Sequence, residues 1–217
     1  DTLNGGAGND TIDGGAGNDT IIITNSEAAA LNAALVRNVE NVEYRGLAGG
    51  NLDMANFEDA TSLLLERTTG AVDVDNLATT DTLTIKDGAA TMDSSLTYTA
   101  AGVTGTADSA TVTLDGVTAA ADIAFVGAVE TMNVNVTSDS SIADLDFDAG
   151  TTALNITAGA DLTVTNQVTS AGVAALTITG AGDVSLTALD AATITVSAGS
   201  ASAVSYTHLR AHETSRY

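Results

Sequence analysis

The sequence contains no cysteine, no proline and no tryptophan, and only 3% of its residues are aromatic. The absence of cysteine excludes disulfides, thiolate zinc sites and cysteine nucleophiles. The scarcity of aromatic rings leaves few side chains on which sugars or nucleic-acid bases could stack. Basic residues are scarce too, since 6 of them stand against 28 acidic residues and give a net charge of −22. Because a chain this acidic repels phosphate groups, we expect no nucleic-acid binding.

Long apolar runs are missing as well. No stretch of about 18 apolar residues occurs, so the sequence predicts no membrane insertion. Hydrophobic residues nevertheless make up 44% of the 217 residues, which is enough to bury a core. They are mainly Ala, Val, Leu and Ile, mixed with Thr and with 21 Gly. This composition favours short strands joined by tight turns.

Both ends of the chain depart from the pattern of the rest. The sequence starts at Asp1 in the middle of a repeat, so we expect the first residues of the parent protein to be missing. Residues 204–217 contain VSYTHLRAHET, which resembles one reading frame of a sequencing-library adapter, and they hold both histidines, His208 and His212. We therefore predict a non-native tail over 204–217 and leave it out of the fold. The remaining chain has neither histidine nor cysteine, so we expect no catalytic triad and no enzyme activity.

The first residues contain a tandem nonapeptide. Residues 5–13 read GGAGNDTID, residues 14–22 read GGAGNDTII, and residues 1–4 match the tail of an earlier copy. The pattern is G-G-x-G-x-D-x-U-x, with Ile12 and Ile21 as the apolar U residues. Glycine permits backbone angles that turn carbonyl groups toward a cation, and aspartate supplies the hard anionic oxygen that calcium prefers. The motif therefore predicts a calcium-binding segment over residues 1–22.

This motif resembles the calcium-binding nonapeptide repeat of RTX proteins, which winds as a parallel β-roll. The resemblance implies that like loops recur about every 18 residues. Asp1 and Asp19 would then share one Ca²⁺ site with carbonyl groups of the glycine loop, whereas Asp10 would face the opposite side, where the partner loop departs from the motif. The candidate calcium ligands are Asp1, Gly5, Gly6, Gly8, Asp10, Gly14, Gly15, Gly17 and Asp19, with Asn9 and Asn18 as residues that stabilise the turns.

The rest of the chain, residues 23–203, alternates apolar and polar residues with a period of two. Examples are Val134/Val136, Ile156 between Asn155 and Thr157, and Leu176/Ile178. This alternation is typical of short strands with one buried face. One short helix is expected near residues 26–36, where alanine and leucine dominate. The predicted fold class is all-β, a parallel β-roll or β-helix, which is a solenoid of short strands. A phrase with valine and glutamate occurs twice, at residues 38–42 and at residues 128–132.

The chain has calcium-binding repeats followed by a long stretch rich in Ala, Thr and Gly that contains valine–glutamate phrases. This organisation resembles the RTX-type surface-layer (S-layer) proteins of Gram-negative bacteria. That resemblance implies an extracellular, calcium-stabilised structural segment at the cell surface, exported by type I secretion. It implies calcium ions and further copies of the chain in a lattice as partners, and cell-surface polysaccharide as a second candidate partner. Two alternatives stay open, namely a module of a large RTX adhesin and the non-catalytic β-helical part of a secreted hydrolase.

Three more carboxylates lie close together in the sequence. Asp144, Asp146 and Asp148 alternate with Leu145 and Phe147, so the sequence places the three carboxylates on one face of a strand, about 7 Å apart. One interpretation is a second calcium site, and another is a carboxylate pair like that of glycosidases. A third is the charged, solvated face of an edge strand, where charge discourages aggregation.

Overall fold

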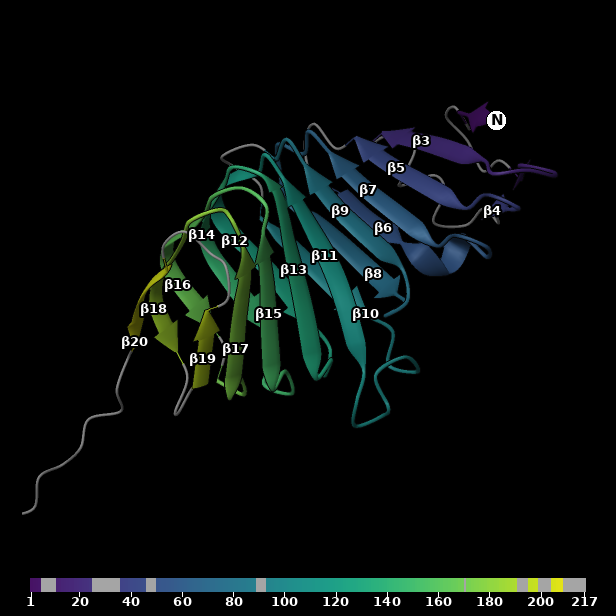
Figure 1. Cartoon of the computed structure of the whole chain (residues 1–217). Coiled ribbons are helices and arrows are strands. Elements are labelled where there is room, and N and C mark those ends of the chain that lie inside the picture. Colours follow the sequence, from purple (N-terminus) through teal and green to yellow (C-terminus); the bar gives the residue numbers. More distant parts are fainter. Residues whose placement is uncertain are drawn as a thin grey trace, which may run out of the picture.

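The computed structural model describes residues 1–4, 11–24, 36–45, 50–88, 93–169, 171–190, 195–198 and 204–208. Within these residues the chain winds as a parallel β-solenoid with two main sheets that lie face to face (Figure 1). The predicted all-β solenoid is confirmed. The predicted helix over 26–36 lies outside the described residues except for Val36, which belongs to a strand.

From β5 onward each coil of the solenoid contributes one strand to each main sheet. The odd-numbered strands therefore form one sheet, and the even-numbered strands from β6 onward form the other. The ten-stranded sheet contains, in spatial order, β1 (Thr2–Leu3), β3 (Thr20–Thr24), β5 (Asn41–Arg45), β7 (Ser62–Glu66), β9 (Thr82–Lys86), β11 (Ser109–Asp115), β13 (Thr131–Ser138), β15 (Ala153–Ala158), β17 (Ala175–Gly180) and β19 (Thr195–Ala198). The eight-stranded sheet contains β20 (Val204–His208), β18 (Val184–Asp190), β16 (Leu162–Thr169), β14 (Ser140–Phe147), β12 (Thr118–Val126), β10 (Ser94–Tyr98), β8 (Val72–Leu77) and β6 (Gly50–Asp53).

A small third layer flanks the N-terminal coils. It consists of β2 (Ile12–Asp13) and β4 (Val36–Arg37), which pair in parallel. A 3₁₀ turn, η1 (Met54–Asn56), directly follows β6. Phe57 forms a bridge with Val36 and is buried, which joins this layer to the core. No helix in the described part of the chain is long and apolar enough to cross a membrane.

The core runs along the whole solenoid between the two sheets. Residues with the predicted period of two, such as Val134 on β13 and Ile156 on β15, are almost completely buried, and their neighbours in the sequence face outward. Phe125 and Phe147 stack on each other inside, with ring centroids 5.5 Å apart. Because each rung is too short to bury its apolar face alone, stability depends on the contact between neighbouring rungs.

The register of the sheet fixes the length of each coil. Thr2 pairs with Thr20, which confirms the predicted recurrence after 18 residues at the N-terminus. From Thr111 through Asn133 to Asn155, successive partners on β11, β13 and β15 lie 22 residues apart. Since β3 pairs with β1 on one side and β5 on the other, the nonapeptide segment and the following region share one continuous sheet.

Residues 204–208, which belong to the predicted non-native tail, form β20 and pair with β18. Val204 aligns with Val184, and Tyr206 aligns with Leu186. The apolar alternation of this segment therefore allows it to add a strand to the sheet. That residues 204–217 are foreign to the parent protein stays a prediction.

Candidate calcium site at the start of the solenoid

The carboxylate of Asp19 is the most deeply buried acidic group in the described part of the chain. Asp19 immediately precedes β3 and is only 1% exposed. Its backbone N–H donates a hydrogen bond of 2.8 Å to Oε2 of Glu40, which comes from the next coil. Its Oδ2 atom is buried without a hydrogen-bond partner. A buried anionic oxygen with no partner is costly, so this position favours a cation.

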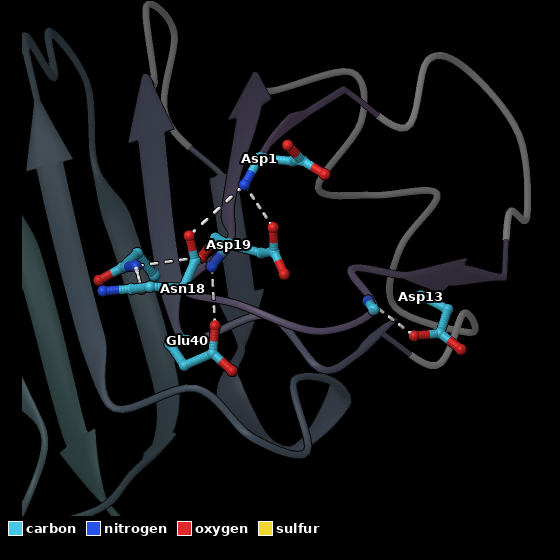
Figure 2. Close-up of polar contacts among 7 residues, drawn as sticks. Asp1, Asp13, Asn18, Asp19 and Glu40 are labelled. Atoms are coloured by element: carbon cyan, nitrogen blue, oxygen red, sulfur yellow. Dashed lines mark hydrogen bonds and ion pairs between the residues drawn. The ribbon is translucent and has the colours of Figure 1, made fainter.

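Asp1 lies one coil before Asp19, as predicted, but its carboxylate does not face that residue. The contact with Oδ1 of Asp19 is made by the backbone nitrogen of Asp1, which is the terminal amino group of the sequence described, whereas the Asp1 side chain is 88% exposed. The carbonyl group of Asp1 accepts a 2.8 Å hydrogen bond from the N–H of Thr20. Figure 2 shows Asp1, Asn18 and Glu40 around Asp19, with the amino group of Asp1 turned toward the carboxylate. The predicted pair of carboxylates at this position is therefore not formed, because Asp1 approaches Asp19 through its backbone nitrogen.

The glycines of the second nonapeptide have the geometry that the motif requires. Gly15 and Gly17 have φ angles of +87° and +134°, which side chains rarely allow. A Cβ atom on Gly14 would lie 2.0 Å from the carbonyl oxygen of Asn38, so this glycine is needed for close packing against the next coil. Asn18 contributes its side-chain oxygen to a hydrogen bond from Asn41, which supports its predicted role in stabilising the turn.

Asp13, at the end of β2, lies apart from this cluster (Figure 2). Its Oδ1 atom accepts hydrogen bonds from the side chain of Asn38, at 2.7 Å, and from the N–H of Gly15, at 3.0 Å. These two hydrogen bonds lower the pKa of the Asp13 carboxyl group. Asp13 therefore fixes the loop that carries Gly15 and Gly17, and its carboxylate already has two hydrogen-bond donors.

The predicted ligands of the first nonapeptide, Gly5, Gly6, Gly8 and Asp10, lie outside the described residues, as does Asn9. In the part of the chain that the structure describes, no three acidic or histidine side chains converge closely enough to hold a metal ion. A calcium ion bound at Asp19 would therefore take most of its six to eight oxygens from backbone carbonyl groups. The positive φ angles of the glycine loop suit that requirement.

The comparison with known families agrees with this geometry. Residues 1–22 match the family model described as the RTX calcium-binding nonapeptide repeat (4 copies). This segment is an RTX calcium-binding repeat. No curated protein and no solved structure matches the chain. RTX repeats bind calcium and belong in general to secreted, extracellular proteins, so the match supports the assignment of residues 1–22 as a calcium-binding segment.

Glu40 is a residue of this site that we did not predict. It comes from the valine–glutamate phrase at residues 38–42, outside the RTX repeat, and it accepts the N–H of Asp19. The second copy of the phrase behaves in the same way, because Oε2 of Glu130 accepts the N–H of Asp108 at 2.9 Å. The duplicated phrase is the feature of the sequence that indicates these glutamates. Each of them accepts the backbone N–H of the residue that precedes a strand of the preceding coil. Of the two residues capped in this way, Asp19 belongs to the RTX repeat and Asp108 does not.

Replacing Glu40 by glutamine should weaken calcium binding without unfolding the solenoid. Glutamine keeps an oxygen that accepts the N–H of Asp19 but removes the negative charge next to the site. Loss of a residue that supports a metal ligand costs about 10–100-fold in affinity. The midpoint of a calcium titration measures this effect, and Glu130→Gln is the matched control. Equal shifts in both variants would contradict a specific role for Glu40.

The three carboxylates Asp144, Asp146 and Asp148 do not form one site. Leu145 and Phe147 are buried between them, as predicted, so Asp144 and Asp146 share the outer face of β14. Asp148 follows the strand, and its Oδ1 atom accepts the N–H of Gly150 at 2.8 Å within a turn. It therefore has a structural role, which the sequence spacing alone could not reveal.

Asp122, which the sequence does not predict as a neighbour of Asp144, lies directly opposite it on β12. Burial raises the pKa of Asp122, and so do a hydrogen bond with Asp144 and the charges of Asp144, Asp146 and Asp93. Asn166 donates a hydrogen bond of 3.1 Å to Asp144. Because like charges directly opposite each other destabilise a sheet, this pair costs stability at neutral pH.

The variant Asp122→Asn should therefore be more stable than the unmodified chain at pH 7, by about 0.2–1 kcal/mol. A carboxyl group with a raised pKa in the folded state costs stability while it is ionised and loses this cost as the pH falls through that pKa. The advantage of the variant should therefore shrink on acidification. Thermal unfolding at pH 7 and at successively lower pH measures it. A constant difference at every pH would contradict the assignment.

Proposed function

We propose that this chain is a non-enzymatic, calcium-stabilised structural segment of an extracellular bacterial protein, of the surface-layer type. The buried carboxylate of Asp19 carries the proposal. It is 1% exposed, it has an oxygen without a partner, and it lies where the RTX repeat passes into the long sheet. An ion bound there would stabilise the first coils, on which the following coils stack.

The proposed mechanism is neutralisation of charge. A net charge of −22 opposes compaction, because carboxylates on stacked coils repel one another. Calcium binds the folded coils and not the unfolded chain, since the site exists only once neighbouring coils are in place. Folding would therefore follow calcium concentration, low before export and high outside the cell.

Several acidic groups elsewhere act as structural hydrogen-bond acceptors, which supports a structural role. Oδ1 of Asp139 accepts the N–H of Asp161 at 3.1 Å, and Oδ1 of Asp161 accepts the N–H of Asp183 at 2.8 Å. The three residues lie 22 positions apart and form a ladder across successive coils. Asp139 and Asp161 line an open cavity of about 330 Å³, together with serine and threonine hydroxyl groups. We propose no catalytic role for these groups, because their oxygens hold the backbone in register.

Assembly experiments separate the surface-layer proposal from its alternatives. The full chain is examined by sedimentation velocity and by electron microscopy in calcium, with equal magnesium as the control. We expect calcium-specific self-association into ordered arrays. A chain that stays monomeric and instead binds isolated host glycans would contradict the proposal and favour an adhesin. Polysaccharide cleavage that is lost on Asp146→Asn would favour a hydrolase.

A further inference from the structure

Acidic residues at the start of the ten-stranded sheet are aligned from coil to coil. The strand register places the residues immediately before β1, β3 and β5 opposite one another, and these are Asp1, Asp19 and Glu40. Glu40 therefore occupies, one coil later, the position that the motif aspartate would have if the repeat continued. It lies outside the segment that matches the RTX repeat. On the next coil the same position is Thr61, so the aligned carboxylates end at Glu40.

The carboxylate of Glu40 is close to the carboxylate of Asp19. Oε2 of Glu40 accepts the backbone N–H of Asp19 at 2.8 Å, as the dashed line in Figure 2 shows. Only the Cα and Cβ atoms separate this nitrogen from the carboxyl group of Asp19, so an oxygen that contacts the nitrogen also lies near that group. Oδ2 of Asp19 is buried and has no hydrogen-bond partner. A cation bound at Oδ2 would therefore have the Glu40 carboxylate as a neighbour.

These two carboxylates have no basic side chain to neutralise them. Within the described residues, the basic side chains that form ion pairs contact Glu43, Glu58 and Glu66, and none of them contacts Glu40. Two carboxylates that share a site disfavour each other's ionised form. A divalent cation held by both would remove this repulsion, and a second anionic ligand raises the affinity of a site for calcium.

The backbone of Glu40 is held firmly in place. Its neighbours Val39 and Val42 are buried in the core. Its carbonyl oxygen accepts the N–H of Thr61 at 3.0 Å and the N–H of Ser62 at 3.1 Å, both from the following coil. A ligand on such a backbone loses little conformational freedom when an ion binds, so the position is suited to a metal site.

Glu130 shows what the same backbone contact looks like without a candidate site. Its Oε2 atom accepts the N–H of Asp108 at 2.9 Å, which repeats the contact between Glu40 and Asp19. There, however, Oδ2 of Asp108 accepts the N–H of Gly105 at 3.0 Å. Capping of a strand therefore accounts for Glu130 completely. At Glu40 it leaves the buried, unpartnered oxygen of Asp19 unexplained.

We propose that Glu40 is a direct ligand of the cation at Asp19, so that the first coil beyond the RTX repeat completes the last calcium site. The carboxylates of Asp19 and Glu40 would bind the ion together, and backbone carbonyl groups and water would supply the other oxygens. This inference rests on the proposed calcium-stabilised function and deepens it, since a single ion then links the repeat to the long sheet that follows.

The test counts the water molecules on the bound ion. Tb³⁺ takes the same hard oxygen ligands as Ca²⁺, and its luminescence lifetimes in H₂O and D₂O give the number of coordinated waters. The full chain is loaded with one equivalent of Tb³⁺, and displacement by Ca²⁺ verifies the site. We expect Glu40→Ala to gain about one or two waters, because a carboxylate supplies one or two oxygens to the ion. Glu130→Ala loses the same kind of cap and should keep the water count of the unmodified chain.

An unchanged water count in folded Glu40→Ala would overturn the inference and leave Glu40 as a capping residue only. An equal gain in Glu40→Ala and Glu130→Ala would overturn it as well. If circular dichroism shows that Glu40→Ala does not fold, Glu40→Gln decides in its place. Glutamine keeps an acceptor for the N–H of Asp19 but is an uncharged and weaker ligand, so the variant should also gain water.

Failure of the calcium site itself gives a different result. In that case the unmodified chain binds no Tb³⁺ that Ca²⁺ displaces, or Asp19→Asn binds Tb³⁺ as tightly as the unmodified chain does. Either result would contradict the proposed function and this inference together. Binding that depends on Asp19, with a water count that does not depend on Glu40, would contradict this inference alone.

Discussion

Replacing Asp19 by asparagine is expected to abolish the calcium-dependent step in folding. The variant keeps the size of the side chain but removes the buried anionic oxygen that has no partner. Because Asp19 is a direct candidate ligand, the loss of calcium affinity should exceed the roughly 10–100-fold that follows from losing a supporting residue. In the absence of calcium the variant loses the charge that pairs with the amino group of Asp1 but keeps an amide oxygen that can accept the same hydrogen bond, so we expect its stability to change little. Isothermal calorimetry and calcium-dependent thermal unfolding measure the two effects.

Asp108 provides the matched control for this experiment. Its N–H is capped by Glu130 as that of Asp19 is capped by Glu40, but its Oδ2 atom accepts the N–H of Gly105 at 3.0 Å. Asp108→Asn should leave the calcium midpoint unchanged. An unchanged calcium affinity in the Asp19 variant, or an equal loss in both variants, would show that the ion does not bind at Asp19.

The second large effect is expected in the core, with the variant Ile156→Ala on β15. Ile156 is 1% exposed and lies in register between Val134 and Ile178. Removing a buried isoleucine side chain to alanine costs about 2–5 kcal/mol, because the cavity adds to the lost transfer free energy. In a solenoid this loss weakens the contact with both neighbouring rungs. Denaturant unfolding measures the free energy difference.

The neighbouring residue Thr157 gives the comparison for Ile156. Thr157 faces outward, so Thr157→Ala should change the free energy of unfolding by no more than about 0.5 kcal/mol. The calcium midpoint should be the same in both variants, since β15 lies far from the RTX repeat along the sheet order. Equal destabilisation by the two substitutions would mean that the buried and exposed faces of β15 are assigned wrongly.

The fold was largely predictable because alternation with a period of two is a strong local signal. Pairs such as Val134/Val136 and Leu176/Ile178 lie in strands, with the apolar side chains buried. Strand β12 carries only a weak signal, because its sequence TAAADIAFV has few large apolar residues and its register shifts between Ala119 and Asp122. Nor could the alternation predict which strands share a sheet, since coil lengths vary along the chain.

The candidate site was predictable only where the motif itself supplies the geometry. The repeat indicated Asp19 and the glycines with positive φ, but it could not show that Asp1 approaches Asp19 through its backbone nitrogen and not through its carboxylate. Glu40 and Asp122 were missed because each acts across coils, and sequence spacing does not determine register between coils.

The most direct test of the central claim is far-UV circular dichroism of the full chain, titrated first with calcium and then, in a separate sample, with magnesium. The account predicts a gain of β-sheet signal that is specific to calcium, saturates, and is reversed by a chelator. It also predicts that the gain disappears in Asp19→Asn and persists in Asp108→Asn. A spectrum that is identical with and without calcium would contradict the claim that calcium binding at the RTX repeat stabilises this solenoid.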